Sequence, residues 1–302
     1  MQMNSEKKIE VVCFGEVLWD NLPSGRLPGG APMNVAYHLN KLGVTGRLIS
    51  QVGNDQDGRE LIDELTRLGI DVQHCKLDRW HKTSTVEVSF TEEHEAKYEI
   101  VFPAAWDFIA DPVPHSDLVL RSDAFVFGSL SCRHEVTKIT LLKLLAGASY
   151  KVFDVNLRVP HYDMQTLEHL LGMTDLLKIN LQELLLLTSP FQPGPLSQEQ
   201  RVALLQSKFG IAEVVLTKGK DGAIFFDRDN FYTQSSFPVD VVDTVGSGDS
   251  FLAAFLAKKL GGCPPTESLA FASALAAFVT SKKGACPTYQ ISELEVWRNG
   301  LK

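Results

Sequence analysis

Short apolar segments alternate with helical patterns along almost the whole of this 302-residue chain, and this alternation limits the fold more than any other feature. The apolar segments predict strands at Glu10–Phe14, Leu48–Val52, Ala124–Phe127, Lys151–Asp154, Leu176–Ile179 and Val214–Thr217. Helical patterns lie between them at Val35–Leu42, Gly58–Leu68, Val136–Leu145, Leu167–Leu171 and Gln198–Phe209. Strands and helices in this order form right-handed crossover units. We therefore expect an α/β protein with three αβα layers around a mostly parallel sheet.

One region breaks the alternation. Residues Thr83–Phe90 alternate between apolar and polar, and Tyr98–Phe102 continues as a strand after a charged turn. This pattern predicts a β-hairpin with one apolar and one polar face. Two placements remain open: a small sheet set apart from the main one, which could act as a lid, or an edge hairpin of the main sheet.

The charge balance and the cysteines exclude several classes of partner and compartment. The net charge is −8, which argues against general binding to nucleic acid or to an anionic membrane. Five scattered cysteines with no C-x-x-C pair indicate free thiols in a reducing compartment. The polar segment Met1–Glu10 lacks the apolar core of a secretion signal, and no apolar run is long enough to cross a bilayer. We expect a cytoplasmic protein.

Polar or glycine-bearing segments follow the predicted strands. They are residues 15–20, Asp154–Arg158, Lys178–Glu183 and Thr217–Gly222. Because the carboxyl ends of parallel strands share one edge of a sheet, these segments are expected to lie close together. Ligands of open parallel sheets bind at that edge, so a binding site is predicted there.

A glycine-rich turn, Val242–Phe251, leads directly into a helical pattern. Its glycines let the backbone approach a ligand closely, and the first amides of the helix form a seat for an anion. Asp249 lies in that first turn, where an acid either caps the helix or does chemistry on a ligand. The segment is not a P-loop, because no Gly-Lys-Ser/Thr follows, and Phe251 excludes a dinucleotide fingerprint. The nearly all-apolar helix pattern Ser268–Thr280 is expected to be buried against this helix.

A second glycine turn begins another helix at Pro28–Asn34. Pro32 suits the first helical turn, and Asn34 would lie on that turn with its amide free for a ligand. A local cap is the competing interpretation of Asn34.

Together these residues resemble the ribokinase-like (PfkB) family of carbohydrate kinases, and within it the fructokinase-like sugar kinases, over essentially the whole chain. The motifs that carry the resemblance are a glycine pair ending in Asn at Gly29–Asn34, Asp-Thr-x-Gly-x-Gly-Asp at Asp243–Asp249, Asn-x-x-Glu at Asn180 and Glu183, Thr-x-Gly-x-x-Gly at Thr217, Gly219 and Gly222, and the ending Lys283–Ala285. The resemblance implies a single ribokinase-like domain over residues 1–302, with a small β-sheet lid formed by segments near 15–29 and 83–105.

The same resemblance implies transfer of the γ-phosphoryl group of ATP to a sugar hydroxyl. Asp249 would be the base that takes the hydroxyl proton. The amides of Gly246, Ser247 and Gly248 would form the anion hole for the moving phosphoryl group. Physical chemistry agrees, because phosphoryl transfer depends on positioning and on fixed dipoles aimed at developing charge.

Further residues match the family's binding positions. Asp20, Gly30 and Asn34 match the sugar-binding positions, and carboxylate and amide groups suit vicinal hydroxyls. Arg158 is placed near the substrate or the transferred phosphate, with a surface ion pair as an equal alternative. Trp106 with Asp107 either lines the pocket or, as the favoured interpretation, belongs to the core.

The resemblance also implies binding sites for the nucleotide and for two ions. Asn180, Glu183, Thr217, Gly219 and Gly222 would bind the nucleotide. Mg²⁺ would be organised through water near Asn180 and Glu183, since magnesium often keeps several waters. A monovalent cation, K⁺, is expected near Asp243 and Gly284, and a homodimer could form through the lid.

Fructose is the favoured acceptor. A ribose, ketodeoxy-sugar or nucleoside kinase of the same family is the alternative, because pocket shape cannot be read from spacing. A catalytically silent sugar sensor on the same fold is the alternative from another class, and the intact turn with Asp249 argues against it. A nicotinamide-dependent oxidoreductase lacks its fingerprint.

Overall fold

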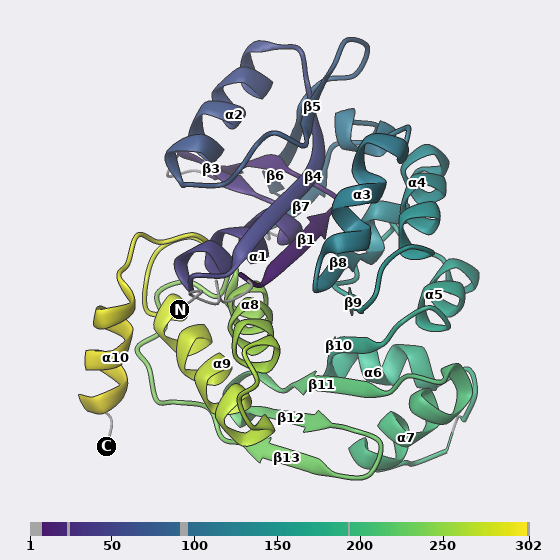
Figure 1. Ribbon diagram of the computed structural model, residues 1–302, viewed down its shortest axis with the longest axis vertical. Helices are drawn as coiled ribbons and strands as arrows, with labels where there is room; N and C mark the ends of the chain where they lie inside the picture. The colour runs from purple at the N-terminus through teal and green to yellow at the C-terminus, as the bar shows by residue number, and fades with distance from the viewer. Residues whose placement is uncertain (1–7, 23–24, 91–95, 193, 301–302) are drawn as a thin grey trace, which may run out of the picture.

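The computed structural model describes residues 8–22, 25–90, 96–192 and 194–300, and its main feature is a nine-stranded sheet (Figure 1). In spatial order the strands are β13 (Phe231–Gln234), β12 (Ala223–Phe226), β11 (Glu213–Thr217), β10 (Leu176–Asn180), β9 (Lys151–Asp154), β8 (Ala124–Gly128), β1 (Glu10–Phe14), β4 (Thr45–Gly53) and β5 (Cys75–Asp78). All neighbours from β11 to β5 pair in parallel, whereas β12 and β13 are antiparallel. The predicted mostly parallel sheet is confirmed.

All six predicted strands are present, and β1 and β9 have the predicted bounds. Strands β5, β12 and β13 were not predicted; they have four residues each and lie at the two ends of the strand order. Unlike β9, which is equally short, none of them lies between two α-helices, so the alternation of strands and helices did not indicate them.

Helices cover both faces of the sheet. One core lies between the sheet and α1 (Ala31–Lys41), α2 (Gln56–Arg67), α8 (Ser247–Leu260), α9 (Pro265–Thr280) and α10 (Ile291–Gly300). The other lies under α3 (Val113–Arg121), α4 (Glu135–Leu145), α5 (Met164–Leu171), α6 (Leu181–Thr188) and α7 (Gln198–Phe209). The central strand β1 sends Val11 and Cys13 into the first core and Val12 and Phe14 into the second. The three-layer αβα arrangement is therefore confirmed.

The five predicted helices correspond to α1, α2, α4, α5 and α7. Helix α7 begins with a capping box, since Gln200 N donates to Ser197 Oγ and Ser197 N donates to Gln200 Oε1. The apolar helix α9 packs against α8 as expected (Figure 1). Within the described ranges, no helix is long and apolar enough to cross a membrane.

A second sheet of four strands lies apart from the main one, in the order β3 (Gly25–Gly29), β2 (Leu18–Leu22), β6 (Ser84–Phe90) and β7 (Ala96–Ile100). Strands β6 and β7 form the predicted hairpin, although its charged turn, residues 91–95, lies outside the described residues. The edge-hairpin alternative is wrong, because β6 pairs in parallel with β2 rather than with the main sheet. This small sheet is the predicted lid.

Candidate active site

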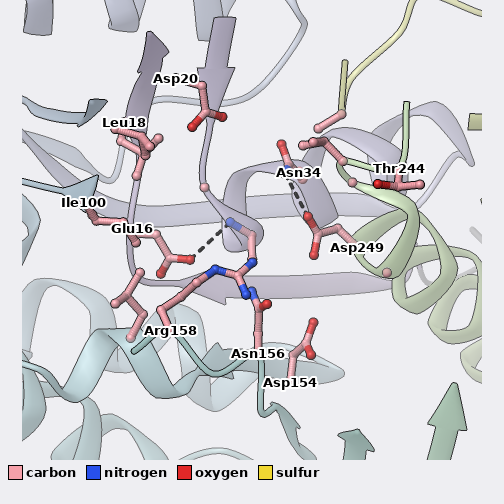
Figure 2. Close-up of a pocket in the computed structure, with 18 of the residues that line it drawn as sticks. Glu16, Leu18, Asp20, Asn34, Ile100, Asp154, Asn156, Arg158, Thr244 and Asp249 are labelled. Atoms are coloured by element: carbon pink, nitrogen blue, oxygen red, sulfur yellow. Dashed lines mark hydrogen bonds between the residues drawn. The ribbon is translucent and has the colours of Figure 1, made fainter. Parts of the chain in front are cut away.

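A cavity of about 1000 Å³ opens where the carboxyl ends of the main strands face the second sheet (Figure 2). Twelve residues predicted to bind ligands or ions line it: Asp20, Gly30, Asn34, Arg158, Asn180, Glu183, Thr217, Asp243, Gly246, Gly248, Asp249 and Gly284. Ser247, Gly219 and Gly222 are not part of the lining. The structure therefore brings together residues from both ends of the chain at the predicted sheet edge.

Asp249 lies in the first turn of α8, and its carboxylate faces Asn34 of α1. Asn34 Nδ2 donates to Asp249 Oδ2 at 2.7 Å, as the dashed line in Figure 2 shows. Burial, and then the nearby charge of Asp154, raises the pKa of Asp249 to about 6, against the opposing influence of Lys178. Such a carboxylate is ionised at neutral pH and is basic enough to accept a proton.

Asn34 is itself held in place by a residue that sequence reasoning missed. Cys286 Sγ lies 3.3 Å from Asn34 Oδ1. The thiol can donate to this carbonyl oxygen, which leaves Asn34 Nδ2 to donate to Asp249. Cys286 therefore fixes the orientation of the amide that Asp249 contacts. Cys286 and Asn34 are 252 positions apart, so no local sequence pattern could have predicted this contact.

The turn before α8 has the geometry of an anion seat. Gly246 has φ 75°, and a Cβ there would lie 2.6 Å from Ala285 Cα, so only glycine fits. Asp243 ties the turn to the C-terminal segment, because its carboxylate accepts from Val245 N and Gly284 N, each at 3.0 Å. In the part of the chain that the structure describes, the amide of Gly248 has no hydrogen-bond acceptor and is available to a ligand.

A buried ion pair lies beside this seat and was also missed. Lys178 Nζ donates to both carboxylate oxygens of Asp154, at 2.8 and 2.9 Å. The ammonium group also lies against α8, since a Cβ on Gly248 would be 3.2 Å from Lys178 Nζ. A lysine inside the otherwise apolar run Leu176–Ile179 was the sequence signal that could have found it.

The opposite side of the cavity carries carboxyl groups. Asp20 of β2 faces the cavity, and burial raises its pKa to about 6. Glu16 is almost completely buried: its Oε1 accepts from Ala31 N at 3.2 Å, while no partner in the described chain reaches its Oε2. The side chain of Arg158 reaches into the cavity between Glu16 and Asp249 (Figure 2).

Glu16 should make stability depend on pH. Burial raises its pKa from 4.5 to about 7, so the folded state binds this proton more tightly than the unfolded chain. The free energy of unfolding therefore loses a contribution as pH rises from 4.5 through 7. Glu16→Gln should accordingly exceed wild type in unfolding free energy by up to about 3 kcal/mol at pH 8 and by little at pH 4. Urea titrations at both pH values measure this, with Glu295→Gln, an exposed site, as control; a difference independent of pH would contradict it.

Asn180 and Glu183 form the capping box of α6. Asn180 Oδ1 accepts from Glu183 N, and Glu183 Oε2 accepts from Asn180 N, both at 2.9 Å. Glu183 Oε1 accepts from Leu157 N at 3.0 Å. Each of these oxygens keeps one lone pair. Asn180 and Glu183 are therefore better suited to accept hydrogen bonds from the waters of a magnesium ion than to bind the ion directly. The chemistry of the donor set thus fits Mg²⁺ held through water.

The predicted nucleotide loop and Trp106 lie at or beyond the edge of the cavity. Thr217 lines it, while Gly219 and Gly222, with φ 57° and 86°, shape the loop that follows β11. A Cβ on Gly222 would lie 2.0 Å from Gln234 O, so this glycine is needed for packing. Trp106 is fully buried and outside the cavity, as the favoured core interpretation predicted, and its neighbour Asp107 is paired with Arg133.

Solved structures define the class of this fold. A fructokinase double mutant from Vibrio cholerae O395, in fructose, ADP and potassium ion bound form, has a TM-score of 0.82 at 25% identity and covers 97% of this chain and 99% of that one. A putative Ribokinase II from E. coli, in complex with ATP and Mg²⁺, has a TM-score of 0.81 at 22% identity, with 97% and 99% covered. The α/β fold is therefore ribokinase-like.

The family follows from the sequence comparison. Residues 21–291 match the family described as pfkB family carbohydrate kinase, and the chain belongs to that family. The fructokinase of Escherichia coli is 28% identical over 265 residues, which are 82% of this chain and 83% of that protein. The family resemblance predicted from the motifs is confirmed, and the chain is an ATP-dependent sugar kinase of this family.

Proposed function

We propose that this kinase transfers the γ-phosphoryl group of ATP to a hydroxyl of fructose. One observation carries the proposal: a carboxylate, Asp249, is oriented by Asn34 in the same helical turn that offers free amides to an anion. A base and an anion seat side by side are what phosphoryl transfer to an alcohol requires.

Each part of the site has a defined task in this reaction. Asp249 accepts the proton of the sugar hydroxyl, and the freed oxygen forms a bond to the γ-phosphorus. The bond from that phosphorus to the β–γ bridging oxygen breaks, and ADP leaves with the electron pair. The amides of Gly246 and Gly248 stabilise charge on the equatorial oxygens, whereas the amide of Ser247 donates to Thr244 O at 3.3 Å. Asn180 and Glu183 would hold the waters of Mg²⁺, which supplies countercharge to the phosphates when bound.

The charges around the sugar end support a neutral acceptor. Glu16, Asp20 and Glu99 all line this part of the cavity, against the single guanidinium of Arg158. An acidic ketodeoxy sugar would place a further negative charge among these carboxyl groups, which is unfavourable. Fructose fits this preference, and the relatives include fructokinases, one of them solved with fructose bound. Ribose, which is also neutral, is the second candidate, because the fold is shared with a putative ribokinase.

An ADP-release assay across neutral hexoses, pentoses, nucleosides and ketodeoxy acids tests the proposal. We expect turnover with fructose, weaker turnover with ribose, little with the acids, and a requirement for Mg²⁺. Adding K⁺ tests the predicted cation site near Asp243 and Gly284. Turnover with no acceptor, despite sugar binding by calorimetry, would identify the chain as a sugar sensor.

A further inference from the structure

The pairing of Lys178 with Asp154 leaves part of the ammonium group unused. The two residues are register partners on the parallel strands β10 and β9, so their side chains lie next to each other on one face of the sheet. Both are almost completely buried. A lysine ammonium has three N–H donors. Two of them are directed at the Asp154 oxygens, at 2.8 and 2.9 Å, and one remains for another acceptor.

Burial opposes the charge on Lys178, but the carboxylates of Asp154 and Asp249 outweigh it and raise the pKa of the lysine, so the ammonium group keeps its charge at this position. Lys178 Nζ would lie 3.2 Å from a Cβ on Gly248, so it lies against the N-terminal turn of α8. That turn is the positive end of the helix dipole, which favours anions and disfavours cations. Positive groups from two elements, the ammonium group of Lys178 and the N-terminal turn of α8 at Gly248, therefore lie close together and line the same cavity. Asp154 compensates the lysine while the cavity contains no anion.

Resting on the kinase function proposed above, we propose that Lys178 is a catalytic residue whose ammonium group contacts the γ-phosphoryl group during transfer. The free N–H donates to an equatorial oxygen of that group, on the side of the phosphorus facing β10. The ammonium neutralises charge without exchanging a proton, and Asp154 is the positioning residue that aims it. The bonds made and broken at phosphorus, and the proton transfer to Asp249, are those already described.

The alternative is that the ion pair serves only the fold. Replacing a buried ion pair by uncharged residues of similar shape often leaves stability unchanged or raised, whereas removing one partner destabilises strongly. Two variants are therefore needed. Lys178→Met removes the ammonium alone, and the double variant Asp154→Asn with Lys178→Met removes both charges and keeps the volumes. Lys151→Met is the matched control, because Lys151 lies at the other end of β9, pairs with Asp175 and does not line the cavity.

Two measurements decide between these roles. The first is kcat with fructose, which should fall by about 10²- to 10³-fold in both Lys178 variants, the range for loss of one donor to a developing anion. The second is calorimetric affinity for a non-hydrolysable ATP analogue and for ADP in the presence of Mg²⁺. The analogue should bind at least about tenfold more weakly, ADP should bind nearly as in wild type, and Lys151→Met should change neither.

The outcomes separate this inference from the proposed function. If the folded double variant keeps kcat within threefold of wild type, or loses affinity for ADP and the analogue equally, Lys178 is structural and the inference is wrong. If wild type phosphorylates no sugar, the proposed function fails. The effect of the Lys178 substitutions on affinity for the ATP analogue and for ADP can still be measured. If the substitutions weaken binding of the analogue and of ADP equally, or if wild type binds no nucleotide, the inference is wrong as well.

Discussion

Replacing Asp249 by Asn is expected to lower kcat for sugar phosphorylation by about 10²- to 10⁴-fold, the usual contribution of a general base. The substitution keeps the shape of the site, because the carbonyl oxygen of the introduced amide can still accept the hydrogen bond that Asn34 Nδ2 donates at 2.7 Å in wild type. Sugar affinity should therefore stay nearly unchanged. Rates at saturating ATP, with calorimetric sugar binding, separate the two effects.

The pH dependence of wild type gives an independent check on the same residue. Burial raises the pKa of Asp249 to about 6, and only the ionised carboxylate accepts a proton. At saturating sugar, kcat should therefore be constant above about pH 7 and fall tenfold per pH unit well below 6. Asp249→Asn should remove this dependence from its residual activity. The exposed Asp240 provides the control, since Asp240→Asn makes the same change outside the cavity. Wild-type turnover in Asp249→Asn would show that another group is the base.

The main fold could be predicted because its signals are local and repeated. Each central strand is an apolar run with a helical pattern on either side, and that order alone implies the parallel sheet. The second sheet was harder to predict. Its hairpin was visible as alternation in Thr83–Phe90, but the parallel pairing of β2 with β6 joins segments more than sixty residues apart, Leu18 with Ser84 for example. Nothing in either segment indicates that pairing.

The residues of the site also differ in whether they could be predicted from the sequence. Residues that contact ligands through fixed motifs, such as Asp249 and Asn34, could be found from short patterns. Residues that hold those groups could not, because their contacts are long-range. Cys286 reaches Asn34 across 252 positions of sequence, and Lys178 reaches Asp154 across a strand pair. Nor could the sequence show that Glu183 Oε1 accepts from Leu157 N, a contact outside the helix cap that joins Glu183 to the segment after β9.

Asp20→Ala is expected to weaken sugar binding strongly. Asp20 lies on β2 of the small sheet and faces the cavity, and within the described chain its carboxylate accepts no hydrogen bond. It is therefore free for two sugar hydroxyls. Hydrogen bonds to a charged group contribute about 1.5–3 kcal/mol each, so losing both should weaken sugar binding about 10²-fold or more. Asp20→Asn keeps one acceptor and should lose less.

The measurement must separate binding from chemistry, because KM equals the dissociation constant only when chemistry is slow. Introducing Asp20→Ala into the Asp249→Asn background meets this condition, and calorimetry then reports sugar affinity directly. It should be done at pH 8, since burial raises the pKa of Asp20 to about 6 and the carboxylate must be ionised. Asn21→Ala is the matched control, because Asn21 is the next residue of β2 and instead donates to Glu87 at 2.9 Å. Neighbouring strand residues point to opposite faces, so Asn21→Ala should leave affinity unchanged. An equal effect of both substitutions would mean that the small sheet, rather than the Asp20 carboxylate, determines sugar affinity.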